Sequence, residues 1–314
     1  MTLPFDHDSE HCRAAQRDWA ALPVRERLRP VAEFRHLVAE RADDLAAAVE
    51  ADIGRDPGEV VATDLLPTAA AAKFLLAEAE RVLRTARPRG RPLWLLGTRD
   101  AIHRRPHGVV GLIGTWNYPI FLTAVPVLHA LVAGNGVLWK PSELTPKTAE
   151  VLYDLFLAAG FSHDLLAKLP GTRDAGPQLA DADIDFLHFT GSEAVGRKLA
   201  ARLGERLIPS ALELSGVDAM FVFPGADAKL AARSAWYGAT FNAGQTCLAC
   251  RRAFVQRSSY AKFVDELRPL VESARPVWLA LPSQLEQADR LLADAARHGA
   301  DVLQTPHPLS LIHI

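Results

Sequence analysis

Between residues 108 and 223, short apolar runs alternate with longer amphipathic stretches, and this alternation constrains the fold more than any other feature. The runs 108–116, 137–140 and 185–189 are rich in β-branched or aromatic residues, and the stretch 192–204 carries its apolar residues at helical spacing. Strands that alternate with helices form a parallel sheet with helices on both faces. The sequence therefore predicts an α/β fold with a Rossmann-like, doubly wound parallel sheet.

The same patterns place the remaining elements. Segments 24–50 and 64–84 show helical periodicity and carry no obvious chemistry. Further helices are expected at 119–133, 145–160 and 175–182, and further strands at 165–171, 211–216 and 219–223. Ligands bind beyond the carboxyl ends of the strands in such sheets, so the loops at those ends are the places to look for a site.

The overall composition excludes several classes of protein. The chain has 314 residues, which suggests about two domains, and a formal net charge of −2 without a basic stripe, so no nucleic-acid partner is expected. No apolar run reaches the roughly 18 residues that span a bilayer, and the start MTLPFDHDSE lacks a hydrophobic signal segment. These features predict no membrane partner and a cytoplasmic location.

The chain has three cysteines, and this small, odd number argues against a disulfide framework. Cys247 and Cys250 form a C-L-A-C sequence, and a redox pair is one reading of it. The preceding N-A-G-Q-T favours another reading, in which small residues leave the Cys247 thiol accessible as a nucleophile. No HExxH or paired Cys/His set is present, so no metal is expected.

Three further polar positions follow strands. Glu213 stands between two leucines in LELSG, where burial would raise the pKa of a carboxylate and suit a general base. Asn117 follows the first strand in GTWNYP and could donate to an oxyanion, while Lys140 and Glu143 follow the second strand in WKPSELTP. Taken singly, each has an ordinary explanation: an ion-paired strand end, a turn asparagine and a helix start.

Together, the segments GTWNYP, WKPSELTP, FTGSEAVGR, LELSG and FNAGQTC resemble the aldehyde dehydrogenase superfamily in order and spacing, over roughly residues 10 to 300. The resemblance implies an NAD(P)-binding domain at 1–212 and the first part of an α/β catalytic domain at 213–304. Residues 305–314 fit neither helix nor strand periodicity and are expected to be a non-native tail.

The resemblance also assigns residues. Cys247 is the implied nucleophile, Glu213 the base, and Asn117 an oxyanion donor together with the Cys247 backbone N–H. Lys140 and Glu143 would hold the adenosine ribose. Gly191 and Ser192 would begin a helix that faces the pyrophosphate, as helix N-termini favour phosphate. The other implied cofactor-binding residues are Ile113, Thr115, Trp116, Ser142, Gly171, Gly176, Phe189, Thr190 and Leu214.

The implied reaction is oxidation of an aldehyde to a carboxylic acid, through a thiohemiacetal and a thioester on Cys247, with NAD as hydride acceptor and NADP as a possible alternative. The partner is a small-molecule aldehyde, and the full-length form is expected to be a homo-oligomer. Two alternatives stay open, namely an inactive cofactor-binding fragment and a CoA-acylating aldehyde dehydrogenase. A cysteine hydrolase would need a histidine partner, and none lies between His188 and His298.

The chain departs from the family pattern at two places. The base segment usually reads E-L-G-G-K, whereas Ser215 and Val217 stand here at its third and fifth positions. The family's later E-x-F-G-P segment and its subunit-pairing strand are absent from these 314 residues. The identity of the aldehyde and the choice between NAD and NADP do not follow from the sequence.

Overall fold

The computed structural model describes residues 4–88, 94, 97–275, 277 and 279–303. The chain divides into two compact units, here called unit 1 (Met1–Asp52 and Asp56–Leu214) and unit 2 (Ile53–Arg55 and Ser215–Ile314). The boundary expected after residue 212 lies two residues before this division. The tail expected at 305–314 lies outside the described residues.

Unit 1 is built on a five-stranded parallel sheet with the order β3-β2-β1-β4-β5. Its strands are β1 (Val109–Ile113), β2 (Gly136–Lys140), β3 (Leu166–Lys168), β4 (Phe186–Thr190) and β5 (Ser210–Glu213). The predicted parallel α/β sheet is confirmed. The chain adds β2 and β3 on one side of β1 and then returns to add β4 on the other side, so the direction of winding reverses between β1 and β4.

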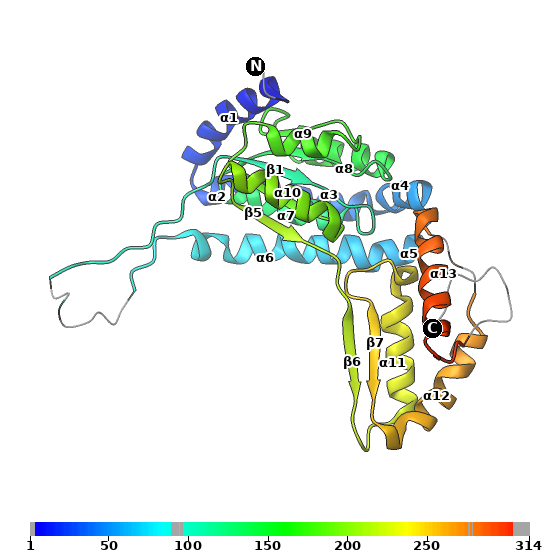
Figure 1. Cartoon of the computed structure of the whole chain (residues 1–314). Helices are drawn as coiled ribbons and strands as arrows, with labels where there is room; N and C mark the ends of the chain where they lie inside the picture. The colour runs from blue at the N-terminus through cyan, green and yellow to red at the C-terminus, as the bar shows by residue number, and fades with distance from the viewer. Residues whose placement is uncertain (1–3, 89–93, 95–96, 276, 278, 304–314) are drawn as a thin grey trace. The chain divides into compact units, whose positions relative to one another are not determined.

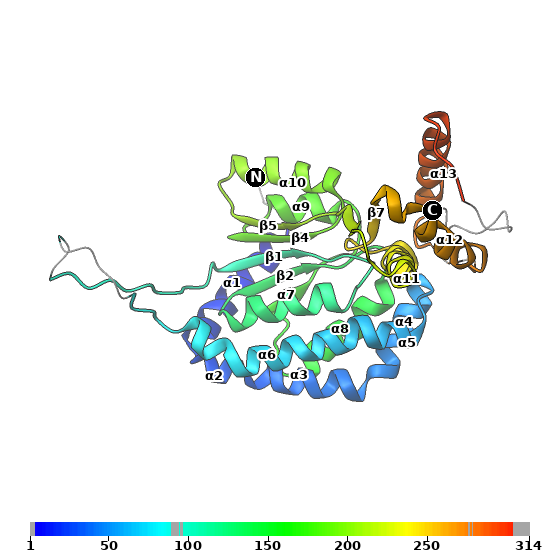
Figure 2. The same ribbon diagram turned by 90° about the horizontal axis from the view of Figure 1, so that it is seen from below.

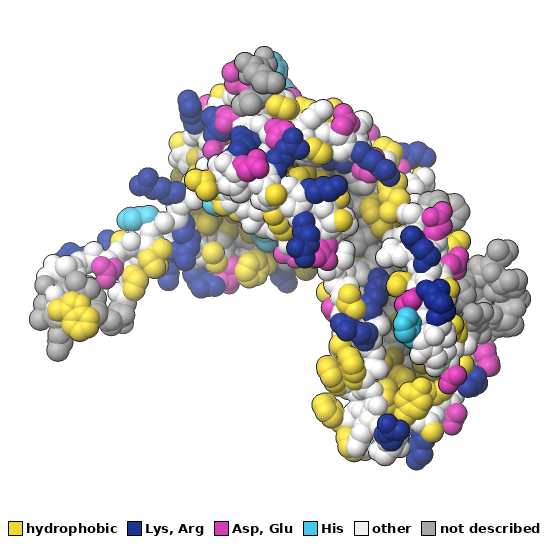
Figure 3. Space-filling model, viewed as in Figure 1, with side chains coloured by type: hydrophobic (Ala, Val, Ile, Leu, Met, Phe, Trp, Pro, Cys, Tyr) yellow, Lys and Arg dark blue, Asp and Glu magenta, His cyan; other side chains and the backbone are white. Residues whose placement is uncertain are grey.

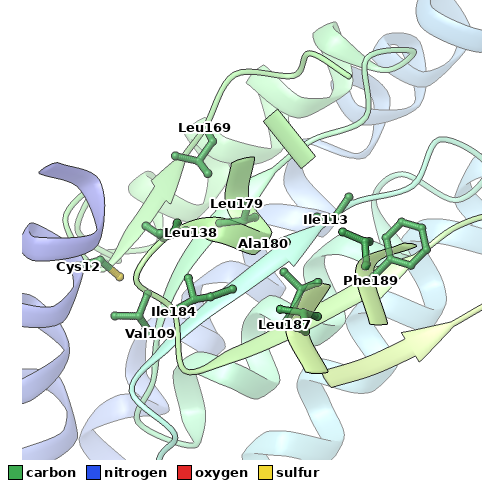
Figure 4. Close-up of a cluster of buried hydrophobic side chains, with 13 residues drawn as sticks. Cys12, Val109, Ile113, Leu138, Leu169, Leu179, Ala180, Ile184, Leu187 and Phe189 are labelled. Carbon is green, nitrogen blue, oxygen red and sulfur yellow. The ribbon is translucent and has the colours of Figure 1, made fainter. Parts of the chain in front are cut away.

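Helices cover both faces of this sheet, as Figure 2 shows. On one side lie α9 (Ala175–Asp181) and α10 (Glu193–Glu205), and on the other lie α7 (Phe121–Val132) and α8 (Pro146–Ala158). Side chains of α9, α10 and the inner strands form one buried hydrophobic cluster (Figure 4). Gly111 lies within it, and a Cβ there would come 3.0 Å from Ile184 and Leu187 and 3.2 Å from Leu179.

Side chains alternate across the sheet along β4. Leu187 and Phe189 belong to the hydrophobic cluster, so His188 and Thr190 point to the opposite face. The Thr190 hydroxyl lies 3.4 Å from His188 Nε2. Burial lowers the pKa of His188, although the Glu213 charge partly opposes this effect. This alternation also decides which way residues of the neighbouring β5 point.

The N-terminal helices precede the sheet: α1 (Asp6–Ala21), α2 (Val24–Arg27), α3 (Arg29–Glu40), α4 (Ala42–Ile53), α5 (Pro57–Val60), the π-helix η1 (Val61–Leu65) and α6 (Leu66–Leu83) (Figure 1). The expected helix at 24–50 is thus three helices. Helix α1 has no counterpart among the expected elements. Its Cys12 packs against Gly136 at the start of β2, where a Cβ would meet the sulfur at 2.5 Å.

The continuous helical stretch Pro57–Leu83 is long and apolar enough to cross a bilayer by length and composition, and its most apolar 18-residue window has a mean hydropathy of 1.5. The sequence patterns predict no segment of this kind. One third of its most apolar window is buried, and its residues Thr68, Ala72, Leu75 and Ala79 are buried in unit 1. Core helices of globular domains pass the same test, so the finding is weak evidence for a membrane span.

Unit 2 contains a parallel pair of strands, β6 (Asp218–Val222) and β7 (Cys250–Val255). Its helices are α11 (Ala228–Thr240), the 3₁₀ helix η3 (Phe241–Gly244), α12 (Arg257–Glu272) and α13 (Pro282–Arg297). Side chains of α11, α12 and the strands form the core of this unit. Phe221 and Phe254 stack on each other with ring centroids 5.1 Å apart, yet both are at least half exposed. Figure 3 shows hydrophobic side chains on the surface of this unit.

Candidate functional site

The implied cofactor-binding residues gather at one edge of unit 1. All five strands of the sheet are parallel, so their carboxyl ends lie along the same edge. The residues at or after these ends are Ile113, Thr115, Trp116 and Asn117 (β1); Lys140, Ser142 and Glu143 (β2); Gly171 and Gly176 (β3); Phe189, Thr190, Gly191 and Ser192 (β4); and Glu213 and Leu214 (β5). The fold brings them together, and their roles stay predictions.

The loop after β1 fixes the amide of Asn117. The Thr115 hydroxyl donates to Asn117 Oδ1 at 2.9 Å. Because the amide oxygen accepts this hydrogen bond, the amide nitrogen is oriented away from Thr115 and suits a donor role. The loop begins at Gly114, where a Cβ would come 3.0 Å from the Thr123 hydroxyl and 3.2 Å from the Trp139 indole nitrogen. The position therefore has little room for a larger residue.

Lys140 and Glu143 form an ion pair at the end of β2. The Lys140 side chain is 5% exposed, and its Nζ lies 3.1 Å from Glu143 Oε2. Arg173, in the turn between β3 and α9, donates from Nε to Glu143 Oε1 at 3.1 Å. Partial burial acts to raise the pKa of Glu143, but its own backbone N–H and the two cations outweigh this and lower the pKa. Glu143 is therefore a carboxylate held between two cations.

The segment after β4 forms the start of helix α10. Ser192 is the N-cap of this helix, and its hydroxyl accepts a hydrogen bond from the Val195 N–H at 3.4 Å. Gly196 in the first turn lies against Leu214, since a Cβ there would meet the Leu214 side chain at 2.5 Å. The helix start therefore packs closely against the residue that follows β5.

Glu213 is placed differently from the sequence expectation. It ends β5, pairs in register with Thr190, and its carbonyl accepts from the Gly191 N–H at 3.0 Å. Its side chain is exposed, so the burial expected from the flanking leucines is wrong. The reason is strand geometry: Leu212 and Leu214 both pack against the hydrophobic cluster, which leaves Glu213 on the other side of the strand.

Cys247 lies in unit 2, in the turn between η3 and β7, and its side chain is exposed. The preceding Asn242, Ala243 and Gly244 all have positive φ values of 51°, 54° and 71°. For Ala243 this left-handed conformation is unfavourable by about 1–2 kcal/mol, whereas asparagine tolerates it more readily. Strained backbone of this kind clusters at functional sites, which agrees with a nucleophile at Cys247.

Hydrogen bonds hold this strained loop in place. Asn242 is 3% exposed, and its Nδ2 donates to the Gln245 carbonyl at 3.4 Å. The Gly244 carbonyl accepts from Arg251 Nη2 at 2.9 Å, so a side chain of β7 also holds the loop. The exposed thiol of Cys247 thus stands on a backbone that is fixed on both sides.

The segment that carries the implied base reaches this loop within unit 2. Gly216, three residues after Glu213, lies against the backbone of Cys247, since a Cβ on Gly216 would come 2.5 Å from the Cys247 carbonyl oxygen. No side chain fits at that distance from a backbone atom without a shift of the chain. The two segments LELSG and FNAGQTC, 34 residues apart in the sequence, are therefore adjacent at this point.

The three cysteines are expected to differ in reactivity. Cys247 is exposed and Cys250 half-buried, whereas burial raises the pKa of the fully buried Cys12 to about 12. Only the thiolate reacts with disulfide reagents, and the raised pKa keeps the buried Cys12 thiol protonated at pH 8. Titration of the folded chain with an aromatic disulfide should detect two thiols, and the third only after unfolding. Three fast-reacting thiols in the folded chain would contradict this placement of Cys12.

The same pKa shift makes stability depend on pH. The pKa of Cys12 is higher in the folded chain than in the unfolded one, so its contribution to stability is complete below the unfolded pKa. That contribution is lost as the pH rises from about 9 toward 12.

The donor set at the edge of unit 1 fits a dinucleotide. A buried ammonium with a carboxylate suits ribose hydroxyls, and the capped start of α10 suits a phosphate. Gly171 and Gly176 leave space beside neighbouring strand ends: a Cβ would stand 3.6 Å from Pro141 at the first and 3.8 Å from Ile113 at the second. Among the described residues, no group of three or more His, Cys, Asp or Glu side chains could hold a metal ion.

Two residues of this region were not singled out from the sequence. Arg173 could have been found as a positive charge inside the glycine-bearing P-G-T-R-D-A-G turn. Asp64, on η1, accepts from the Ile120 and Phe121 backbone N–H groups just after the Asn117 loop. Nothing in the sequence indicates this contact, because its partners lie 56 and 57 positions away.

Comparison with known proteins shows what the chain is similar to. The model of the aldehyde dehydrogenase family matches residues 5–304. A 4,4'-diapolycopene aldehyde oxidase of Methylomonas sp. is 34% identical over 249 residues, covering 79% of this chain and 47% of that protein. A putative succinate-semialdehyde dehydrogenase (NADP+) of Mycolicibacterium smegmatis is 35% identical over 303 residues, covering 93% of this chain and 58% of that protein.

Solved structures of similar fold are also known. The crystal structure of PnpE in complex with nicotinamide adenine dinucleotide superimposes with a TM-score of 0.87 at 26% identity and covers 95% of this chain and 62% of that one. PnpE is from Pseudomonas sp. WBC-3. The chain spans about half the length of the curated relatives it matches.

Proposed function

Because this chain belongs to the aldehyde dehydrogenase family, we propose that it oxidises an aldehyde to a carboxylic acid with Cys247 as nucleophile and Glu213 as general base. The observation that carries the proposal is the exposed Cys247 thiol at the end of the strained, hydrogen-bonded loop from Asn242 to Gly244. A buried structural cysteine such as Cys12 needs no such loop.

The chain's own residues divide the chemistry as follows. The Cys247 thiolate attacks the carbonyl carbon of the aldehyde and forms a thiohemiacetal. The amide of Asn117 and the backbone N–H of Cys247 donate to the oxyanion, and removal of one such donor typically costs about 10²–10³ in rate. NAD(P)+, when bound, supplies the acceptor for the hydride whose loss leaves a thioester on Cys247.

Glu213 completes the cycle. Its exposed carboxylate accepts a proton from a water molecule, which attacks the thioester carbon and releases the acid and the Cys247 thiolate. The exposure of Glu213 supports this role, because the base must reach a water molecule. Glu213 ends β5, and Gly216, three residues later, lies against the Cys247 backbone. This position supports the pairing of base and nucleophile.

The cofactor would lie at the carboxyl ends of the unit 1 strands. Lys140 and Glu143 would bind the adenosine ribose, and the start of α10 at Gly191 and Ser192 would face the pyrophosphate. The winding reverses between β1 and β4, and ligands of open α/β sheets bind at such a point.

The test follows absorbance at 340 nm with NAD+ and NADP+ and a panel of short and aromatic aldehydes, in the chain and in the longest product of its gene. Mass spectrometry after acid quenching would locate the acyl group on the peptide that contains Cys247. We expect aldehyde-dependent absorbance and a Cys247 adduct. A folded, cofactor-binding protein that gives neither the absorbance nor the Cys247 adduct with any aldehyde tried would contradict the proposal.

A further inference from the structure

The feature that leads beyond this function is a row of polar side chains on one face of β4 and β5. The apolar residues of the two strands pack against the hydrophobic cluster on the other face: Leu187, Phe189, Leu212 and Leu214. His188 and Thr190 of β4 and Glu213 of β5 therefore share a face. Thr190 and Glu213 are partners in the parallel register, so their side chains stand about one strand spacing apart, roughly 4.8 Å.

The proposed base lacks a partner that holds it. Among the residues that the structure describes, no hydrogen bond or ion pair involves the exposed Glu213 carboxylate. A glutamate side chain has several rotatable bonds, and a general base acts only within hydrogen-bond reach of the proton that it accepts. A donor that fixes this carboxylate would therefore serve the hydrolytic step, and the register partner Thr190 carries a hydroxyl on the same face.

His188 decides where the Thr190 hydroxyl points. Its Nε2 lies 3.4 Å from Thr190 Oγ1. A hydroxyl has one hydrogen and a neutral imidazole has one N–H, so the tautomer of the ring determines which of the two donates. With the hydrogen on Nε2, the ring donates to Thr190, and the hydroxyl hydrogen is available to Glu213. With the hydrogen on Nδ1, the hydroxyl donates to the ring and cannot donate to a carboxylate.

The surroundings of His188 favour a neutral ring with the hydrogen on Nε2. Burial lowers the pKa of His188, the Glu213 charge acts to raise it, and His129 in the last turn of α7 acts to lower it. The strand neighbours Leu112 and Ala211 carry no charge. The ring is therefore mainly neutral at pH 7. The negative charge of Glu213 favours the tautomer whose N–H begins a chain of donors toward it.

We propose that His188 is a positioning residue for Glu213 and acts through the Thr190 hydroxyl. The inference rests on the proposed role of Glu213 as general base. His188 Nε2 donates to Thr190, and Thr190 donates to one oxygen of the Glu213 carboxylate. The other oxygen stays free to accept the proton of the attacking water. Because such a chain ends on a charge, each hydrogen bond strengthens the next.

The first test is NMR of the full chain with 15N-labelled histidine, which needs no turnover. The ring nitrogen shifts report the tautomer, and we expect the hydrogen on Nε2 of His188. In Glu213→Gln the pKa of His188 should fall, because the carboxylate that acts to raise it is gone. A hydrogen on Nδ1, or the same His188 pKa in Glu213→Gln, would overturn the inference and leave the proposed function standing.

The second test separates the two halves of the reaction at saturating NAD(P)+. The first turnover of NAD(P)H reports acylation of Cys247, and quench-flow mass spectrometry follows the decay of the thioester. His188→Leu and Thr190→Val should each slow the decay about 3- to 10-fold, as expected for one hydrogen bond, and leave acylation within about twofold. The double variant should be no slower than either single one, because both break the same chain. His188→Gln keeps a side-chain N–H and should restore most of the decay rate.

The matched control is His107→Leu. The His107 ring packs on Phe186 of the same strand, with centroids 4.8 Å apart, at the end of β4 opposite Thr190. This variant should change neither rate. Slowing of acylation and decay to the same extent in His188→Leu, or no rescue by His188→Gln, would show a purely structural role and overturn the inference. A folded, cofactor-binding chain that forms no thioester with any aldehyde would instead overturn the proposed function.

Discussion

Glu213→Gln is expected to retain one round of aldehyde oxidation and to lose sustained turnover. Glutamine keeps the shape of the side chain but cannot take a proton from water, so the thioester on Cys247 would accumulate. We expect a rapid burst of about one equivalent of NAD(P)H per protein, followed by a steady state slower by about 10²–10⁴. Stopped-flow absorbance at 340 nm measures both phases, and mass spectrometry counts the acylated Cys247.

The matched control is Cys247→Ser, which should show neither burst nor steady state because the hydroxyl is a far weaker nucleophile than the thiolate. Coenzyme A added to Glu213→Gln separates two readings of the family. Full restoration of turnover by the thiol of the added coenzyme A would favour transfer of the acyl group to CoA over hydrolysis. Unchanged steady-state turnover in Glu213→Gln without any added thiol would show that another group activates the water.

Sequence patterns predict the sheet of unit 1 and the helices between its strands, because these elements are local. The central strands β1, β2 and β4 are mainly apolar runs, and glycine, proline and capping residues such as Ser192 mark the helix ends. Helix α1 was not predicted because its buried face has few large apolar side chains. Its buried residues are Ser9, Cys12 and Gln16. The pattern of three small or polar residues does not distinguish a core helix from a solvated one.

Non-local pairing limits the prediction elsewhere. Strands β5 and β6 are four residues apart, yet β5 joins the large sheet and β6 pairs with β7, which begins 28 residues after β6 ends. No periodicity in either strand indicates this change of partner. The predicted burial of Glu213 is wrong for a related reason. Its leucine neighbours indicate the environment of the opposite side of the strand, not that of Glu213 itself.

The candidate site shows the same division. The segment order predicts Cys247, Glu213 and Asn117 as catalytic residues, because motif and proposed chemistry lie in adjacent residues. It does not identify Arg173 as a partner of Glu143, which lies 30 positions away, or the positive φ values that precede Cys247. Contacts made only by the folded chain therefore supply the further details of specificity and strain.

Asp64→Ala is expected to destabilise unit 1 through the loss of a buried acceptor. The Asp64 side chain is fully buried, and its Oδ1 accepts from the Ile120 N–H at 3.1 Å and the Phe121 N–H at 2.8 Å. Alanine would leave two N–H groups at the start of α7 without this acceptor, at a cost of about 1–3 kcal/mol each. Removal of a buried polar side chain recovers part of that cost, so we expect a net loss of about 2–4 kcal/mol.

Two variants calibrate this value. Asp64→Asn retains an oxygen acceptor and should lose less stability than the alanine variant. Asp56→Ala removes a carboxylate that caps the Glu59 N–H at 3.0 Å on the exposed side of α5, and should cost about 0.5–2 kcal/mol. Urea unfolding of unit 1, followed by tryptophan fluorescence, gives the three free energies. An Asp64→Ala loss no greater than that of Asp56→Ala would show that burial adds nothing to this contact.

The same variant should act on the site through the backbone. Ile120 and Phe121 follow directly on the loop from Gly114 to Pro119, so the two hydrogen bonds to Asp64 fix the far end of the segment that carries Asn117. The near end is fixed by β1 and by the Gly114 N–H, which donates to the Lys140 carbonyl at 2.9 Å. Loss of one anchor would free the Asn117 amide to move, and an oxyanion donor acts only where it is held in advance. Asp64→Asn keeps the acceptor and serves as the control. We therefore expect Asp64→Ala, which loses both hydrogen bonds, to slow the burst of NAD(P)H while leaving the dissociation constant of NAD+ unchanged. An equal effect on both would mean that Asp64 supports the whole strand edge rather than the Asn117 loop.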